Sequence, residues 1–140
     1  DVVKNDGDLI IIDDYAHHPT EIKVTMQSIE LYKNLTSATK NIVVWQPHKY
    51  SRTRDNLEAF KTCFAGCDEL IILPVWTVNE PILDIDFVHE FASYNPIFAD
   101  SVKRYGDVLE IWKDEHIITT IKEGIVLGVG AGDITYQLRA

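Results

Sequence analysis

Residues 9–21 read LIIIDDYAHHPTE, and in this stretch a strand signal passes directly into a helix start. The short aliphatic run predicts a strand over 8–12 that is buried on both faces. Pro19 at the first helical position and Glu21 in the first turn predict a helix behind it. The core face of that helix is predicted from apolar residues at helical spacing, namely Ile22, Met26, Ile29 and Tyr32.

Strand and helix signals continue to alternate along the rest of the chain. Further strands are predicted over 41–46, 69–75, 96–98 and 125–127, and further helices over 53–64, 84–93, 101–112 (with Ser101 as its cap) and 133–139. The segment 114–123 fits either type. This alternation predicts one α/β domain with a mostly parallel sheet that is covered on both faces. The order of the strands does not follow from the pattern.

Composition excludes several classes of function. The net charge of −9 argues against a nucleic-acid partner, because phosphate neutralisation needs a basic face. No apolar run approaches the ~20 residues of a membrane span, and no signal peptide opens the sequence, so we expect a cytoplasmic protein without a membrane partner. Cys63 and Cys67 lack partners at zinc-site spacing, which favours buried structural thiols.

The turn over 13–21 carries two acids, a tyrosine and two histidines between a strand and a helix. Asp14 can accept hydrogen bonds from ribose hydroxyls, and Tyr15 can lie against an aromatic ring. His17 and His18 can donate to a carboxylate or a phosphate, but adjacent histidines point apart, so at most one faces a ligand. The alternative is a loop that only ends the strand and starts the helix.

A second polar stretch, QPHKYSRTR over 46–54, follows the next strand. It places four basic side chains in an otherwise acidic chain: His48, Lys49, Arg52 and Arg54. At a strand end and helix entry, where backbone N–H groups also point outwards, this suits a carboxylate or a phosphate. The alternative is a solvated, capped helix start, and Arg54 beside Asp55 fits that reading.

The third stretch, GVGAGD over 128–133, follows the last predicted strand. As a dinucleotide-binding fingerprint it is weak, because Asp133 stands where the final glycine belongs and too little chain follows. It predicts a tight turn whose amides, at Gly130 and Gly132, can approach a small ligand. The chain contains no G-x-x-x-x-G-K-[ST] phosphate loop, no H-E-x-x-H and no G-x-S-x-G.

Taken together, DDYAHHPTE over 13–21, QPHKYSRT over 46–53 and GAGDI over 130–134 resemble the C-terminal domain of the Mur ligases. The closest match is to the branch of the family that adds L-alanine to UDP-N-acetylmuramate. The resemblance spans almost the whole chain, and the domain that it implies is expected over residues 1–140. It implies a Rossmann-like, three-layer fold with a six-stranded, mostly parallel sheet that contains one antiparallel strand.

The resemblance also implies a cytoplasmic, ATP-dependent ligase of peptidoglycan precursor synthesis. A central domain, absent from this chain, holds most of the ATP and Mg²⁺, and an absent N-terminal domain holds the UDP-sugar. The muramyl carboxylate becomes an acyl phosphate, which the amine of L-alanine attacks before phosphate leaves. This chain then orients the nucleotide and the amino acid, and alone it is expected to be inactive.

Site roles carry over position by position from the resemblance. Asp14 matches the acid that holds the ATP ribose, with Tyr15 beside the nucleotide. His17 and Arg52 match the groups at the reacting centre, and no metal ligand is implied. The substrate-binding set is His48, Lys49, Arg52, Gly130 and Gly132. Lys49 stands where the family usually has arginine, so two-point carboxylate binding is lost there.

Other functions remain open at this point. The muropeptide ligase of cell-wall recycling shares the first motif but differs in the second. A metal-dependent hydrolase would use His17, His18, His48, Asp13 and Asp14, although no two histidines lie at i,i+4. A non-catalytic module that binds a nucleotide or an amino acid is the third possibility. A small side-chain pocket separates L-alanine from glycine or serine by only ~1–3 kcal/mol, so selectivity stays undecided.

Overall fold

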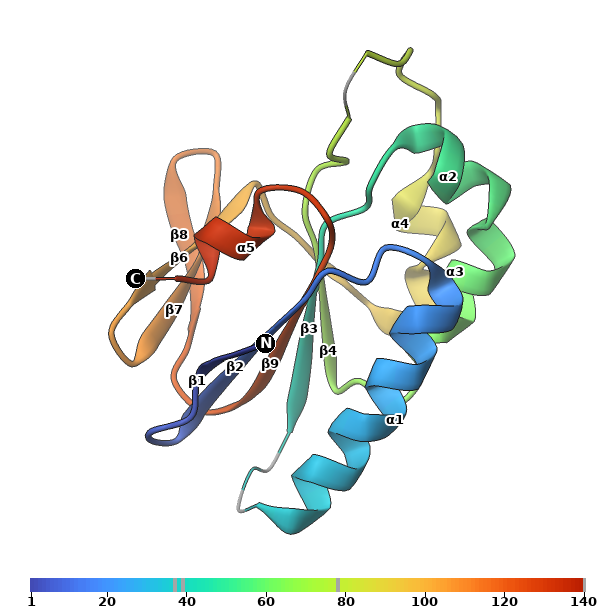
Figure 1. Cartoon of the computed structure of the whole chain (residues 1–140). Coiled ribbons are helices and arrows are strands. Elements are labelled where there is room, and N and C mark those ends of the chain that lie inside the picture. The colour runs from blue at the N-terminus through green and yellow to red at the C-terminus, as the bar shows by residue number, and fades with distance from the viewer. Residues whose placement is uncertain (37, 39, 78, 140) are drawn as a thin grey trace.

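A six-stranded sheet with the order β1-β2-β9-β3-β4-β5 forms the centre of the computed structural model (Figure 1). The structure describes residues 1–36, 38, 40–77 and 79–139. Every neighbouring pair is parallel except β1 with β2. This confirms the predicted α/β class and the single antiparallel strand. The strands are β1 (Val2–Lys4), β2 (Leu9–Asp14), β3 (Asn41–Trp45), β4 (Glu69–Ile72), β5 (Ile97–Phe98) and β9 (Gly124–Val129).

Helices cover one face of this sheet, as Figure 1 shows. They are α1 (Pro19–Leu35), α2 (Tyr50–Asp55), α3 (Leu57–Cys63), α4 (Phe87–Glu90) and the 3₁₀ turn η1 (Ala92–Tyr94). Trp45 lies at the centre of this layer, with ring centroids 5.1 Å from Phe60, 5.0 Å from Phe64 and 5.2 Å from Phe91. Pro19 starts α1 as predicted, and Ile22, Met26 and Ile29 are buried.

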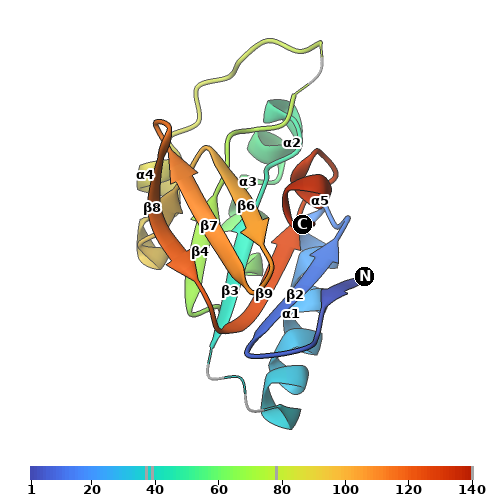
Figure 2. The same ribbon diagram turned by 90° about the vertical axis from the view of Figure 1, so that its left-hand side faces the viewer.

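A three-stranded antiparallel sheet and a short helix cover the opposite face (Figure 2). The sheet contains β6 (Ser101–Tyr105), β7 (Val108–Lys113) and β8 (His116–Ile121), and the helix is α5 (Ile134–Gln137). Alternate residues of the central strands, such as Leu9, Ile11 and Val44, bury their side chains in this second core. The sheet is therefore covered on both faces, as predicted.

The prediction of a helix over 101–112 was wrong, because this segment forms the β6–β7 hairpin. Val102, Leu109 and Ile111 are buried at 1%, 0% and 0% exposure, and all point to the second core. Gly106, with φ 57°, makes the turn between the two strands. Burial on one side of two paired strands outweighs the helical spacing of the apolar residues, and the ambiguous segment 114–123 supplies β8.

Two other predicted helices are present in altered form. The helix predicted over 53–64 begins earlier, at Tyr50, and is broken at Asn56, whose side chain donates to the Arg52 carbonyl at 2.9 Å. The segment 84–93 contains only α4 and the start of η1. The break at Asn56 makes α2 a separate unit of six residues, which carries Arg52 and Arg54.

Candidate functional site at the carboxyl edge of the sheet

The loops after β2, β3, β4 and β9 meet at one edge of the sheet, because these four strands run parallel. Backbone hydrogen bonds tie the loops together. Gly130 N–H donates to the Asp14 carbonyl at 3.2 Å, and Gln46 N–H donates to the Val129 carbonyl at 2.9 Å. All three polar stretches singled out in the sequence therefore lie at the same edge.

Asp14 is half-buried, and its carboxylate fixes the turn after β2. Its Oδ1 accepts from Ala16 N–H at 2.9 Å, and its Oδ2 accepts from the Thr25 hydroxyl of α1 at 2.6 Å. Each carboxylate oxygen has a further lone pair and can accept a second hydrogen bond. Tyr15, next in the chain, is 61% exposed. Its ring is free to contact a ligand beside Asp14.

His17 and His48 come together from two different loops, with ring centroids 5.8 Å apart. His17 is oriented by a hydrogen bond between its Nδ1 and the Tyr15 carbonyl at 3.0 Å. His18 is exposed and occupies the N-cap position of α1 without a side-chain cap bond. Of the two adjacent histidines, only His17 lies at the site.

The half-buried side chains of His48 and Arg52 form the centre of a cationic cluster. Burial lowers the pKa of His48, and the nearby Arg52, His17 and Lys49 lower it further. Among the described residues, His48 Nδ1 and Arg52 Nη1 are buried nitrogens without a hydrogen-bond partner. Buried polar groups in native proteins are nearly always paired, so these two nitrogens indicate a missing partner. An arginine N–H can only donate, and the partner that suits it is an anion.

Lys49 holds an unusual backbone conformation within this cluster, with φ 67° and ψ 135°. Such a conformation costs a non-glycine residue of order 1–3 kcal/mol and persists only where the surroundings impose it. Here Lys49 N–H donates to the Trp76 carbonyl at 2.8 Å, and Trp76 N–H donates to the Pro47 carbonyl at 2.8 Å. The loop after β4 therefore sets the shape of the cationic loop after β3.

The backbone N–H groups at the start of α2 are available to a carboxylate, and one from this chain already binds two of them. In the structure, the N–H groups of Tyr50 and Ser51 bind the carboxylate of Glu80, at 2.5 Å and 3.4 Å. A carboxylate within the chain thus satisfies these free helix-start donors. The side chains of the cluster are therefore the groups left for an external anion.

The glycine turn packs tightly against the loop after β3. A Cβ atom at Gly130 would lie 2.8 Å from the Gln46 carbonyl, and one at Gly132 would lie 2.5 Å from Gln46 Oε1 and from the ring of Trp76. Gln46 holds the turn through its side-chain amide, which donates to Asp133 Oδ1 at 2.6 Å and accepts from Ile134 N–H at 3.2 Å.

A pocket of about 290 Å³ lies beside this turn. Three aromatic side chains line it together with the glycine turn: Tyr15 and Trp76 from two loops, and Tyr136 from α5. Trp76 and Tyr136 are 36% and 77% exposed. Aromatic faces around an open pocket suit a flat ring or an apolar ligand surface.

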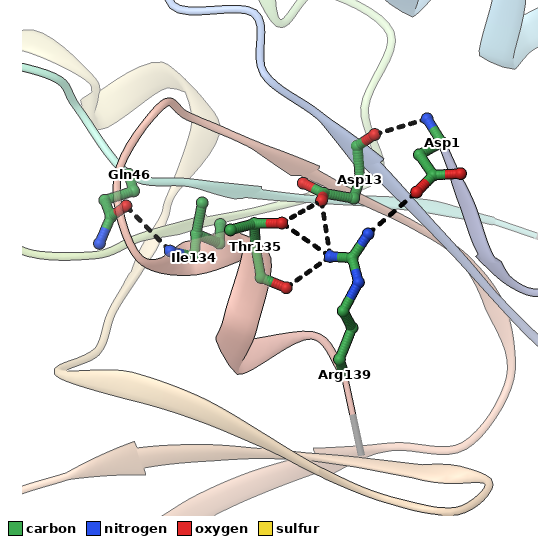
Figure 3. A network of polar contacts seen from close by, with 6 residues as sticks. All are labelled: Asp1, Asp13, Gln46, Ile134, Thr135 and Arg139. Atoms are coloured by element: carbon green, nitrogen blue, oxygen red, sulfur yellow. Dashed lines mark hydrogen bonds and ion pairs between the residues drawn. The ribbon is translucent and has the colours of Figure 1, made fainter.

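Asp13 points away from this site, to the α5 side of the sheet (Figure 3). Its Oδ2 accepts from the Thr135 hydroxyl at 2.5 Å and from Arg139 Nη1 at 2.7 Å, and its side chain is 1% exposed. Arg139 also contacts Asp1 at 3.0 Å. Asp13 is therefore a structural acid that holds the chain end against β2.

The metal-hydrolase alternative lacks a ligand set in the described part of the chain. No group of three or more His, Cys, Asp or Glu side chains that could hold a metal ion occurs there. Asp13, which that alternative requires beside His17 and His48, is bonded to Thr135 and Arg139 instead. Nor is any described helix long and apolar enough to cross a membrane.

Sequence reasoning missed three residues that shape the site: Gln46, Trp76 and Glu80. Gln46 lies inside the second motif, but the chemistry predicted there comes from the basic residues that follow it. Trp76 and Glu80 lie after the strand predicted over 69–75, in the loop after β4, which carries no motif. The signal was available, since the carboxyl ends of parallel strands share an edge and the loop after a third strand must reach the same site.

Comparison with known proteins gives consistent matches. The sequence profile described as "Mur ligase, glutamate ligase domain" matches residues 1–131. The UDP-N-acetylmuramate–L-alanine ligase of Helicobacter pylori is 56% identical over 133 residues, which are 94% of this chain and 30% of that protein. The ligase of the same name from Campylobacter curvus is 45% identical over 139 residues, 99% of this chain and 32% of that protein.

Among solved structures, the UDP-N-acetylmuramate-alanine ligase MurC of Thermotoga maritima matches with a TM-score of 0.55 and 24% identity. The match covers 92% of this chain and 25% of that protein, and it supports the fold alone. The chain thus spans about a third of the length of the curated relatives it matches.

Proposed function

We propose a function from the premise that this chain belongs to the Mur ligase family, as the C-terminal domain. The domain acts within a longer, ATP-dependent ligase that joins L-alanine to UDP-N-acetylmuramate in peptidoglycan precursor synthesis. Support for this substrate pair comes from the names of the relatives from Helicobacter pylori and Campylobacter curvus. The domain's part is to bind the anionic groups of the substrates and to orient the nucleotide.

The observation that carries the proposal is the pair of buried, unpartnered nitrogens, His48 Nδ1 and Arg52 Nη1. They lie in a cluster with Lys49 and His17, within a chain whose net charge is −9. In such a chain, the positive charges of Arg52 and Lys49, placed beside two imidazoles that can donate N–H groups, form a local site that suits an anion. The carboxylate of an amino acid and the oxygens of a phosphoryl group both have that chemistry.

We assign the nucleotide to the other side of the same edge. ATP supplies the phosphoryl group that activates the muramyl carboxylate as an acyl phosphate. Asp14 retains free acceptor lone pairs for ribose hydroxyls, although both oxygens already hold one donor. Tyr15 is exposed beside the 290 Å³ aromatic pocket, which has room for a flat ring. We assign Mg²⁺ to the central domain, as the resemblance implies.

In this proposal the residues of this chain position the substrates and neutralise their negative charge, and they perform no covalent step. Arg52, Lys49 and His48 bind the carboxylate of L-alanine and the charge that develops as the amine attacks. His17 faces the reacting centre, oriented by the Tyr15 carbonyl. The turn over Gly130–Gly132 closes the amino-acid end of the cleft. Positioning groups alone leave no activated electrophile, so residues 1–140 by themselves should not release phosphate.

The test is phosphate release by the full-length protein with ATP, Mg²⁺ and UDP-N-acetylmuramate, with and without L-alanine. Arg52→Ala removes a charge-assisted contact worth about 1.5–3 kcal/mol, so kcat/KM for L-alanine should fall by about 10–150-fold. Arg54→Ala is the matched control, because Arg54 lies on the same short helix, is 57% exposed and pairs with Asp55. We expect that control to keep the wild-type rate.

Each other outcome points elsewhere. Release that ignores free amino acids but responds to a tripeptide indicates the recycling ligase. Wild-type release that depends on L-alanine but survives Arg52→Ala refutes the cationic cluster as the substrate site. Measurable ATP turnover by a clean preparation of residues 1–140 refutes the purely positioning role.

A further inference from the structure

Four hydrogen bonds converge on the carboxylate of Glu80. Its Oε1 accepts from Tyr50 N–H at 2.5 Å and from the Thr77 hydroxyl at 2.9 Å. Its Oε2 accepts from Ser51 N–H at 3.4 Å and from the Ser51 hydroxyl at 3.1 Å. Glu80 lies in the loop after β4, about thirty residues from the donors on α2. A side chain from a different loop therefore caps the helix that carries Arg52.

This cap replaces one that the local sequence does not provide. Lys49 occupies the N-cap position of α2, and its side chain makes no cap hydrogen bond. An N-cap side chain normally satisfies one of the free N–H groups of the first turn. Glu80 satisfies two of them, at Tyr50 and Ser51, and so fixes the direction in which α2 leaves the strand.

The loop after β4 also holds the other side of the same turn. Lys49 N–H binds the Trp76 carbonyl, and the Thr53 hydroxyl binds the Lys49 carbonyl at 2.9 Å. Hydrogen bonds to Trp76 and from Thr53 thus hold Lys49 in its positive-φ conformation. The next residue, Tyr50, donates its N–H to Glu80. Without Glu80, Tyr50 and Ser51 lose their hydrogen bonds to the loop after β4, while the bond from Lys49 N–H to the Trp76 carbonyl remains.

The charge of Glu80 is suited to this role and not to binding substrate. Burial raises the pKa of Glu80, but hydrogen bonds from Tyr50, Thr77 and Ser51 outweigh it and hold the pKa below its usual value. The carboxylate is therefore ionised at neutral pH. The carboxylate accepts four hydrogen bonds from Tyr50, Ser51 and Thr77 of this chain, so its oxygens are used within the fold.

We propose that Glu80 is a positioning residue of the anion-binding cluster, which orders the start of α2 so that Arg52 and His48 face a bound carboxylate or phosphate. This inference rests on the proposed function for the identity of the anion, L-alanine's carboxylate. The anion site itself is argued separately from the proposed function, from the unpartnered nitrogens of Arg52 and His48.

The first test uses the full-length ligase and three variants: Glu80→Ala, Glu80→Gln and Glu58→Gln. Glu58 is the matched control, because it lies on α3 with its side chain 87% exposed. We expect Glu80→Ala to raise KM for L-alanine at least tenfold while KM for ATP stays within twofold. Glu80→Gln keeps one acceptor oxygen and should recover part of that loss. A general loss of folding would move both KM values or kcat alone.

The second test does not need catalysis. The ring resonance of His48 in the full-length protein, identified by its loss in His48→Gln, is followed by NMR while inorganic phosphate is added. We expect a saturable shift in the wild type and in Glu58→Gln, and an apparent Kd at least tenfold weaker in Glu80→Ala.

These two tests separate the two claims. If the wild type shows the phosphate shift but no L-alanine-dependent release, the proposed function fails and the comparison of phosphate affinities decides the role of Glu80. If Glu80→Ala matches the wild type in phosphate affinity, or in KM for L-alanine where activity is present, the inference is overturned. If the wild type binds no phosphate and is inactive, there is no anion site to order, and the inference is overturned as well.

Discussion

Removing Arg139 should destabilise the fold far more than neutralising its partner Asp13. Arg139 Nη1 lies 2.7 Å from Asp13 Oδ2, and the two side chains are 38% and 1% exposed. In Arg139→Met, the Asp13 carboxylate stays buried with the Thr135 hydroxyl as its remaining donor. Removing one partner of a buried ion pair costs about 3–5 kcal/mol. Because water reaches the Arg139 side of this pair, we expect a loss of about 3 kcal/mol.

The reverse change should be milder. In Asp13→Asn no charge is left buried, and Arg139 keeps its contacts with the Thr135 carbonyl at 2.6 Å and hydroxyl at 2.7 Å. The loss is then that of one net hydrogen bond, about 1 kcal/mol. The double variant should lie close to Asp13→Asn, since the stranded charge is gone. The two single effects are therefore not additive.

The assay is urea unfolding of residues 1–140, followed by tryptophan fluorescence, to which the buried Trp45 contributes. With a slope of about 2 kcal/mol per molar urea, a loss of 3 kcal/mol lowers the midpoint by about 1.5 M. The midpoint of Asp13→Asn should fall by about 0.5 M. If both single variants shift the midpoint equally, or if the double variant shows the sum of the two losses, the reasoning from a buried charge is refuted.

Three further predictions concern the site and the thiols. In Gly132→Ala the new methyl group overlaps the ring of Trp76, so the Trp76 side chain should move and its fluorescence should change; an unchanged spectrum contradicts the packing described. Burial raises the pKa of Cys63 to about 12 and that of Cys67 to about 11, so few of these thiols are thiolates at pH 8. Because the thiolate is the reactive form, a disulfide reagent should label both thiols at least about 100-fold more slowly in the native state than in the unfolded chain. Burial lowers the pKa of His48, so the imidazole binds a proton less readily in the native state than in the unfolded chain. The free energy of unfolding should therefore fall as the pH drops below about 6.5. Urea titrations at pH 5–8 should show this fall in the wild type, and His48→Gln should lack the contribution of His48.

The parts of the fold that the sequence predicted correctly are those where local signals and tertiary structure agree. The buried strand before Asp13 and the helix that starts at Pro19 are both present. The hairpin over 101–113 was missed, because Val102, Tyr105, Val108, Leu109 and Trp112 recur at a helical spacing, whereas the paired strands bury Val102, Leu109 and Ile111. Only their shared burial against the second face of the sheet decides between the two, and no local pattern carries that information.

The same limit applies to the site. The residues of the cationic loop, such as His48 and Arg52, were identified from their own motif. Glu80 was not, because its role depends on a contact about thirty residues away in sequence and its own surroundings read as an ordinary loop. The sequence predicts that N–H groups at the start of α2 point outwards, but nothing local shows that Glu80 binds them.

The position of β9 in the sheet has a consequence for how the chain folds. Although β9 is the last strand in sequence, it lies between β2 and β3 and pairs with both. While the ribosome is still making the chain, the sheet therefore consists of two separate parts, each with an apolar edge exposed. Contacts of such long sequence separation slow folding, and unpaired edges invite aggregation. A nascent chain that stops before residue 124 would keep both edges open, which makes the synthesis of β9 the step that completes the central sheet.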